Sequence, residues 1–179
     1  MSGPDQRSWK IHIRKDNLKF SAAHMTVFPD GSKERLHGHN YEVELEVELT
    51  EPVLSQMLSY KAFKQVLRSV CNAWDEKVLV AGDNPWLEPL SGSNDEYAFR
   101  LCGKRYVLPI DEVAVLDVDN ITVENLARIL FERFWMQLTR DQSVPWREQI
   151  VAASLRIDES RGQGATYSVR MGTPTQEYQ

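Results

Sequence analysis

Residues 37–49 have the sequence HGHNYEVELEVEL, in which apolar and acidic side chains alternate from Tyr41 onward. Successive side chains of a strand point to opposite faces, so the pattern gives one apolar face and one acidic face. The apolar face consists of Tyr41, Val43, Leu45, Val47 and Leu49. A sheet with one covered and one wet face is typical of antiparallel architecture. The stretch therefore predicts a long strand of an antiparallel sheet.

The same stretch begins with two histidines, and a third histidine precedes it. His37 and His39 share a face because side chains repeat every two residues, and Gly38 removes a side chain where strand and ligand would crowd. His24 ends a predicted strand centred on residues 18–24, and a hairpin would set it opposite the pair. Three imidazoles leave the fourth zinc position open, as in catalytic sites. The spacing predicts a metal site, with ordinary sheet histidines as the alternative.

Composition narrows the class of protein. A chain of 179 residues suits one domain with a real core, or one domain plus an insertion. The net charge of −5 argues against nonspecific nucleic-acid binding. No window approaches the ~20 apolar residues of a membrane span, and the first residues lack a signal peptide's apolar segment. Cys71 and Cys102 form no CxxC pair, so we expect no disulfide framework and a cytoplasmic setting.

Two helices are predicted from apolar spacing and capping residues. The first follows Ser59 as N-cap and repeats apolar side chains at three- and four-residue spacing up to Trp74. The second starts at Thr122, a capable N-cap, with Glu124 in its first turn to complement the helix dipole.

Further strands are predicted on both sides of these helices. They cover residues 9–13, a hairpin of residues 97–101 and 105–108, and a final pair at residues 150–157 and 165–170. The order ββ-α-(hairpin)-α-ββ predicts an α+β protein.

Four motifs follow one another along the chain. They are FSAAH at 20–24, LHGHNY at 36–41, NITVENLA at 120–127 and RIDE at 156–159, with Tyr167 eight residues after the last. In this order they resemble the 6-pyruvoyltetrahydropterin synthase and 6-carboxytetrahydropterin synthase family. The resemblance implies a tunnelling fold, with a four-stranded antiparallel sheet and two helices on one face. It makes residues 1–179 a single domain and leaves residues 80–117 as an insertion that carries the predicted hairpin.

The resemblance also implies a binding site. It assigns a zinc ion to His24, His37 and His39, and a small-molecule pterin as substrate. The glutamate that holds the pterin ring falls on Glu159, since a carboxylate can accept two parallel N–H bonds from the ring edge. Thr122 is a second candidate for pterin binding. Homo-oligomers are implied as well, as trimers that stack into hexamers with active sites between subunits. On the residues alone, Glu159 would be a solvated hairpin residue.

The acid–base residues depart from the family pattern. The catalytic cysteine of the carboxy-type members falls on Lys33, and the family's aspartate–histidine pair falls on Asp75 and Glu76. Glu34 instead completes an E-x-x-HGH variant, which resembles a branch that bypasses dihydroneopterin aldolase. That branch cleaves the side chain of 7,8-dihydroneopterin triphosphate to give 6-hydroxymethyl-7,8-dihydropterin. We therefore expect Glu34 as the base and Asp75 with Glu76 as a proton relay; the alternative for Glu34 is a charged loop residue.

Three functions stay open at this point. The first is a zinc-dependent pterin lyase whose product is 6-hydroxymethyl-7,8-dihydropterin or a 6-substituted tetrahydropterin. The second is a pterin-binding paralogue without catalysis, which the missing cysteine and histidine favour. The third is a metal-dependent enzyme for a related purine or pterin, with residues 80–117 reshaping the mouth and Lys104 and Arg105 near a phosphate. Iron, nickel or cobalt could replace zinc at a three-histidine site.

Overall fold

The computed structural model describes residues 8–50, 59–140 and 149–171, which form two sheets and two α-helices. The helices are α1 (Tyr60–Asn72) and α2 (Val123–Leu138), with a short 3-10 turn, η2, at Ile110–Glu112. The strands are β1 (Trp9–His24), β2 (His37–Leu49), β3 (Lys77–Ala81), β4 (Leu87–Leu90), β5 (Glu96–Leu101), β6 (Lys104–Pro109), β7 (Val113–Leu116), β8 (Ile150–Ser160) and β9 (Gln163–Arg170). The chain is therefore an α+β protein, as the sequence predicts.

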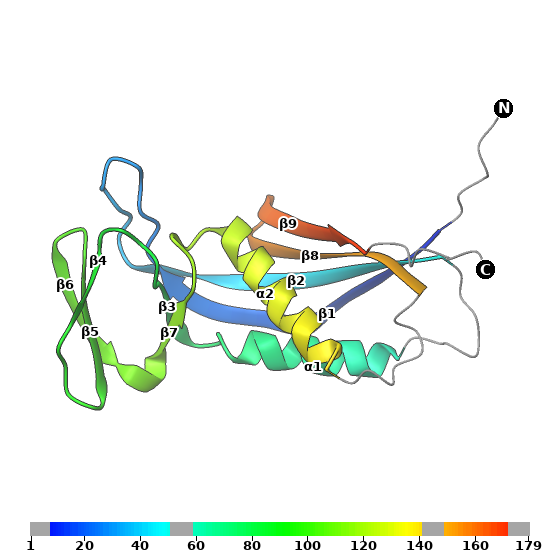
Figure 1. Ribbon diagram of the computed structural model, residues 1–179, viewed down its shortest axis with the longest axis horizontal. Coiled ribbons are helices and arrows are strands. Elements are labelled where there is room, and N and C mark those ends of the chain that lie inside the picture. The colour runs from blue at the N-terminus through cyan, green and yellow to red at the C-terminus, as the bar shows by residue number, and fades with distance from the viewer. Residues whose placement is uncertain (1–7, 51–58, 141–148, 172–179) are drawn as a thin grey trace, which may run out of the picture.

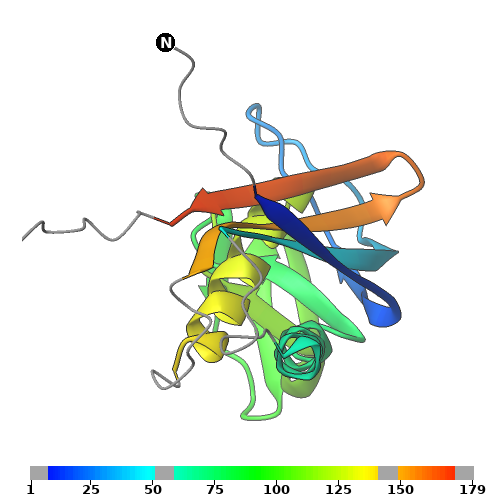
Figure 2. The same cartoon turned by 90° about the vertical axis from the view of Figure 1, so that its right-hand side faces the viewer.

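The larger sheet has six strands in the order β7-β3-β1-β2-β8-β9, and the smaller has three in the order β4-β5-β6. Within the larger sheet, β1, β2, β8 and β9 pair antiparallel, and both helices cover the same face of these strands (Figures 1 and 2). The expected four-stranded antiparallel sheet with two helices on one face is present. The prediction that the whole sheet has four strands is wrong, because the larger sheet has six.

The two additional strands, β3 and β7, extend the sheet beyond β1 through parallel pairs. Ala22 pairs with Lys77, and Val78 pairs with Val113. Each strand is a run of only four or five residues. Runs this short carry no periodicity that separates a strand from a buried helical segment. Parallel neighbours also need long connections, so their pairing is set by distant parts of the chain.

One long strand, β1, replaces the two strands predicted at residues 9–13 and 18–24. Ile13 and Leu18 are both buried. They are five positions apart in the sequence, and strict alternation would place such residues on opposite faces of the strand. The pairing with β2 resolves this, because it shifts from Arg14 opposite Glu44 to Lys19 opposite Glu42. The extra residues form a bulge that restores the buried face and lets one strand run from end to end.

Both helices begin at the predicted caps and pack their apolar faces on the sheet. The side chain of Ser59 accepts a hydrogen bond from the Ala62 amide, and that of Thr122 accepts one from the Asn125 amide. The main core joins buried side chains of both helices to the apolar face of β2, on which every predicted residue is 3% exposed or less. Neither of the two described helices is both long and apolar enough to cross a membrane.

The smaller sheet lies at the end of the molecule where β1 stops and β2 starts (Figure 1). Its β5–β6 hairpin is the one predicted for residues 97–101 and 105–108, and β4 adds a third strand. A second core cluster, which includes Phe99, Leu101 and Val80, packs it against Met25 and Val27. The smaller sheet thus contacts the segment that leads from His24 to His37.

Candidate metal centre

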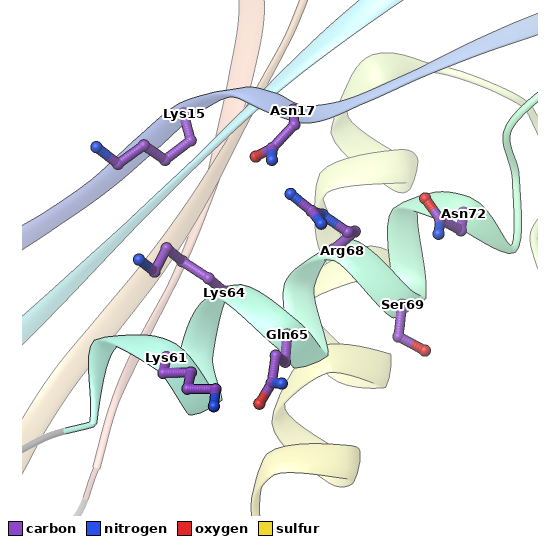
Figure 3. Close-up of a pocket in the computed structure, with 8 residues that line it drawn as sticks. All are labelled: Lys15, Asn17, Lys61, Lys64, Gln65, Arg68, Ser69 and Asn72. Carbon is purple, nitrogen blue, oxygen red and sulfur yellow. The ribbon is translucent and has the colours of Figure 1, made fainter.

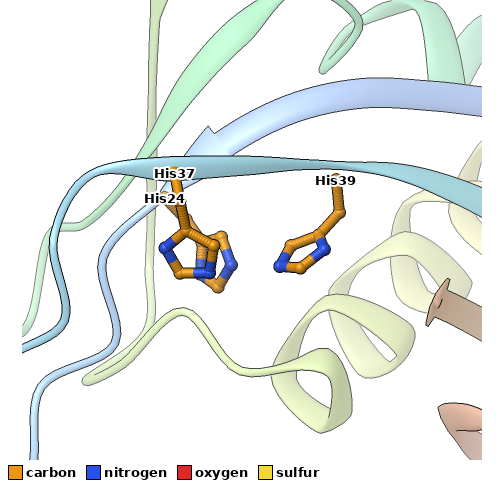
Figure 4. A group of neighbouring side chains, drawn as sticks. All are labelled: His24, His37 and His39. Atoms are coloured by element: carbon orange, nitrogen blue, oxygen red, sulfur yellow. The ribbon is translucent and has the colours of Figure 1, made fainter.

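Strand pairing brings three histidines together at one end of the larger sheet. His24 lies directly opposite His37, and His39 lies opposite Ala22. One ring nitrogen of each of the three histidines lies within 4.8 Å of the others. The three imidazoles project together from the paired strands (Figure 4). The structure therefore assembles His24, His37 and His39 as the strand pattern predicts.

Backbone carbonyl groups orient two of these rings. The Nδ1–H of His24 donates to the Ile121 carbonyl at 3.2 Å, and that of His37 donates to the Arg35 carbonyl at 2.8 Å. A carbonyl oxygen only accepts, so each bond fixes the proton on Nδ1 and leaves the Nε2 lone pair free. Within the described residues, the buried Nε2 of His24 has no hydrogen-bond partner. Metal-bound histidines are held in this way, so the three residues fit a zinc ion.

The electrostatic surroundings keep His24 neutral. Burial, followed by the charge of His37, lowers the pKa of His24 from 6.5 to about 4. A neutral imidazole is the form that binds a metal ion, so this ring is ready to act as a ligand without first losing a proton.

The low pKa of His24 predicts a pH-dependent stability for the metal-free protein. Between pH 6.5 and about 4 the unfolded chain binds a proton at this position that the folded chain does not. The free energy of unfolding therefore keeps its full value with respect to His24 above pH 6.5. It falls, by up to about 3 kcal/mol, as the pH approaches 4. Urea unfolding in the presence of a chelator at pH 7 and pH 4.5 measures it. The decrease should be smaller in His24→Gln, and an equal decrease in both proteins would contradict this account.

Close packing of the backbone explains Gly38 between the two histidines of β2. A Cβ atom at this position would lie 3.2 Å from the Ala22 carbonyl oxygen on β1. The crowding comes from the backbone of the neighbouring strand, whereas we expected crowding from both the strand and a bound ligand. A side chain here would push apart the two strands that carry the histidines.

The side chain of Glu34 lies beside the cluster. Its carboxylate is 4.0 Å from the Nε2 of His37, the nitrogen that faces the metal position, and 39% of the side chain is exposed. Its backbone amide donates to the Thr26 carbonyl at 2.9 Å. The predicted base is therefore at the metal site and remains accessible to a substrate.

The segment that carries Glu34 is tied to the rest of the protein at two points. The side-chain amide of Asn120 bonds to both the N–H and the C=O of Val27, at 3.0 and 2.8 Å. The ammonium of Lys33 donates to the Glu34 carbonyl at 2.9 Å and lies 5.2 Å from the ring centre of Tyr106 on β6. Lys33 thus links the segment to the smaller sheet.

A carboxylate and a phenol continue the same face of the sheet beyond His39. On the antiparallel strands β2 and β8, Glu42 lies opposite Asp158. The next residue of β8, Glu159, therefore comes beside Tyr41, the residue before Glu42 on β2. Glu159 is half-buried and sits at a register shift of the β8–β9 pair, where a bulge can redirect a side chain. Burial, then the charges of Glu159 and Glu34, raise the pKa of Tyr41. Glu34 and Glu159 thus both lie close enough to act on one buried phenol.

Asp75 and Glu76 are held beside β1 by the backbone of Ser21. The carboxylate of Asp75 accepts the Ser21 amide at 2.7 Å, and the Glu76 amide donates to the Ser21 carbonyl at 2.7 Å. Glu76, which has a positive φ of 58°, lines a hollow together with Ser21, Gly38, His39 and Asn40. Within the described residues, no hydrogen bond or ion pair joins Asp75 or Glu76 to the three histidines.

The remaining candidates have structural roles of their own. The hydroxyl of Thr122 caps α2, and the neighbouring Ile121 carbonyl holds His24, so Thr122 lies beside the site. Cys71 is buried, and burial raises the pKa of its thiol to about 12. Cys102 lies in the turn between β5 and β6. Neither cysteine supplies a thiolate base near the histidines.

The contacts that Asn120 and Ile121 make at the site are not predicted from the sequence. Both belong to the motif that starts the second helix, but their contributions come from an amide clamp and a backbone carbonyl. An asparagine two residues before a helix cap suggests only a turn when seen locally. Their role depends on contacts with residues more than 90 positions away.

Comparison with known proteins gives a consistent set of relatives. The family model described as 6-pyruvoyl tetrahydropterin synthase matches residues 12–170. A Methanocaldococcus jannaschii protein, provisionally named a 6-carboxy-5,6,7,8-tetrahydropterin synthase, is 25% identical over 153 residues, which cover 84% of this chain and 89% of that protein. A Pyrococcus abyssi protein with the same provisional name is 29% identical over 121 residues, which cover 64% of this chain and 68% of that protein.

Solved structures share the fold. A crystal structure of Plasmodium vivax 6-pyruvoyl tetrahydropterin synthase superposes with a TM-score of 0.83 at 18% identity, covering 92% of this chain and 99% of that one. The Plasmodium falciparum protein gives 0.82 at 19% identity with the same coverage. A further Plasmodium vivax structure, also with a TM-score of 0.82, is a variant in which a glutamate described as catalytic is replaced by alanine.

Proposed function

The chain belongs to the 6-pyruvoyl tetrahydropterin synthase family, and on that premise we propose that it is a zinc-dependent pterin lyase. Its proposed substrate is 7,8-dihydroneopterin triphosphate or a close relative, and its product is 6-hydroxymethyl-7,8-dihydropterin or a 6-substituted tetrahydropterin. The observation that carries this proposal is the placement of Glu34 at 4.0 Å from the metal-facing nitrogen of His37. A base and a metal position side by side suit chemistry on a hydroxylated side chain.

In this proposal His24, His37 and His39 hold the zinc ion and leave one coordination position for the substrate. When bound, zinc would polarise the side-chain oxygens of the substrate and make their hydroxyl protons more acidic. Two of the three rings are already fixed by carbonyl groups, so little reorganisation is needed to bind the ion.

Glu159 anchors the pterin ring in this scheme. Its carboxylate can accept two N–H bonds from the 2-amino-4-oxo edge of the ring, and its charge acts on Tyr41, two residues beyond His39 on β2, which supports this role. Thr122, beside the carbonyl that holds His24, is the second proposed contact. The ring would then lie along the face between Glu159 and the histidines, with its side chain directed toward Glu34.

Glu34 is the proposed base for side-chain cleavage. Its carboxylate removes the proton from the hydroxyl on the second side-chain carbon, and the bond between the first and second carbons breaks. The second carbon leaves as an aldehyde that carries the triphosphate. The electron pair moves into the pterin ring system, and a proton returned by the Glu34 carboxylic acid to the first carbon completes the hydroxymethyl product. The Plasmodium vivax relative, in which a glutamate is described as catalytic, supports a carboxylate in such a role.

Asp75 and Glu76 are proposed as a proton relay. Both are held by the backbone of Ser21, and Glu76 shares a hollow with His39. The trimer or hexamer that the family resemblance implies has active sites between subunits, so the relay can serve the cluster of the same chain or that of a neighbouring subunit.

Product analysis tests the proposed function. The zinc-loaded protein is incubated with 7,8-dihydroneopterin triphosphate, and the pterins are separated by chromatography with fluorescence detection. We expect 6-hydroxymethyl-7,8-dihydropterin as the main product. Tight pterin binding without any product, unchanged by Glu34→Ala, would contradict the lyase and favour the non-catalytic pterin-binding paralogue.

A further inference from the structure

A basic groove separate from the metal centre lies between the bulge of β1 and the outer face of α1. It is a hollow of about 530 Å³. Its lining consists of Lys15, Asn17, Lys61, Lys64, Gln65, Arg68, Ser69 and Asn72. Asn17 projects from the strand toward α1, Lys15 extends along the strand, and Lys64 and Arg68 extend from the helix toward the strand (Figure 3). The groove thus has cationic groups on both of its walls.

Both walls follow from local structure. Lys61, Lys64 and Arg68 recur at three- and four-residue spacing, so they share one face of α1, which borders its buried face. On the strand, the shift in pairing after Arg14 interrupts regular alternation and leaves Lys15 and Asn17 lining the hollow beside that helix face. The bulge therefore turns a solvent-facing helix into one side of a groove.

The charge of this groove is not compensated within the described part of the chain. No acidic side chain lines it, and none of its four cations forms an ion pair with a described residue. Five cations elsewhere in the described part of the chain, Lys10, Arg14, Arg100, Arg128 and Arg156, each pair with a carboxylate. Four like charges in one hollow repel one another, in a chain with a net charge of −5. An anionic ligand would relieve this repulsion.

We propose that this groove binds an oligophosphate group. Lysine ammonium groups act as point charges for phosphate oxygens, and the planar guanidinium of Arg68 can donate two parallel hydrogen bonds to one phosphate. The amides of Asn17, Gln65 and Asn72 and the hydroxyl of Ser69 supply neutral donors around the cations. A chain of phosphates can contact both walls at once, which a single small anion cannot do.

The groove is distant from the histidines of the same chain. Asn17 and His24 are seven residues apart on β1, which corresponds to about 20 Å at the rise of an extended strand. One oligophosphate therefore cannot contact both places within a subunit. The ligand is either the triphosphate of a pterin held at a neighbouring subunit's site or a separate phosphorylated metabolite.

Calorimetric titration of the metal-loaded full-length protein with inorganic triphosphate tests the proposal. The groove variant is the double substitution Lys64→Gln and Arg68→Gln. The matched control is Arg100→Gln with Arg128→Gln, which removes the same charge at two surface ion pairs outside the groove. A third variant, His37→Ala with His39→Ala, removes any binding of triphosphate to the metal ion.

We expect the groove variant to raise the Kd for triphosphate at least tenfold, with the control pair within twofold of the parent and binding retained by the histidine variant. Absence of binding to the parent, equal weakening by the control pair, or loss confined to the histidine variant would each overturn the proposal.

The source of the phosphate follows from kinetics with the pterin triphosphate. A raised KM at unchanged kcat in the groove variant assigns the groove to the substrate's phosphates, and an unchanged KM assigns it to a separate ligand.

Discussion

Replacing His39 with alanine is expected to lower kcat/KM by about a thousandfold or more and to release the metal ion. His39 supplies one of only three ligand nitrogens in the cluster, and two imidazoles do not retain zinc at the affinity of three. Loss of the ion removes several kcal/mol of stabilisation of developing negative charge, which corresponds to a rate loss of this size. The measurements are steady-state kinetics with 7,8-dihydroneopterin triphosphate and metal content by mass spectrometry.

The matched control for this variant is His12→Ala. His12 lies on β1, where its ring is 3.5 Å from the carboxylates of Glu44 and Glu46 on the face that the helices leave uncovered. The substitution His12→Ala removes an imidazole from the same pair of strands and leaves the three histidines of the cluster unchanged. We expect parent-like metal content and activity from His12→Ala. Full metal content in His39→Ala would contradict the assignment of His39 as a ligand.

Replacing Glu34 with glutamine is expected to lower kcat by two to four orders of magnitude while the metal content stays unchanged. General-base catalysis contributes about 10²–10⁴-fold, and glutamine keeps the size and hydrogen bonding of glutamate but cannot accept the proton. Glu34 is 4.0 Å from His37 and half-exposed, so the fold does not depend on its charge. Single-turnover kinetics separate the loss in the chemical step from any change in substrate binding.

Glu132→Gln on α2 is the control for this change, because it removes a glutamate that pairs only with Arg128 on the surface. Its activity should match the parent. An active Glu34→Gln enzyme would mean that another group takes the proton, and Asp75 or Glu76 would then be the next candidate.

The histidine cluster could be predicted because it rests on local geometry. Alternation along β2 puts His37 and His39 on one face, and a hairpin partner brings His24 opposite them. The apolar and acidic faces of β2, both helix caps and the β5–β6 hairpin follow from equally short-range patterns.

The features that could not be predicted depend on long-range pairing. Strands β3 and β7 join the larger sheet through parallel partners that no local pattern specifies. The position of Asp75 and Glu76 beside Ser21 depends on how β3 meets β1, so the resemblance to a motif indicated their identity but not their position. The clamp of Asn120 on Val27 likewise appears only once the two segments are packed together.

X-ray absorption at the zinc edge of the purified protein tests the central claim most directly, when combined with metal quantification. We expect one zinc ion per chain, bound by three imidazole nitrogens at ~2.0–2.1 Å and one oxygen ligand. We also expect that the imidazole signal disappears in His39→Ala and persists in His12→Ala. Sulfur ligation, or a protein that binds no divalent metal at the concentration of the chain, would contradict the central claim.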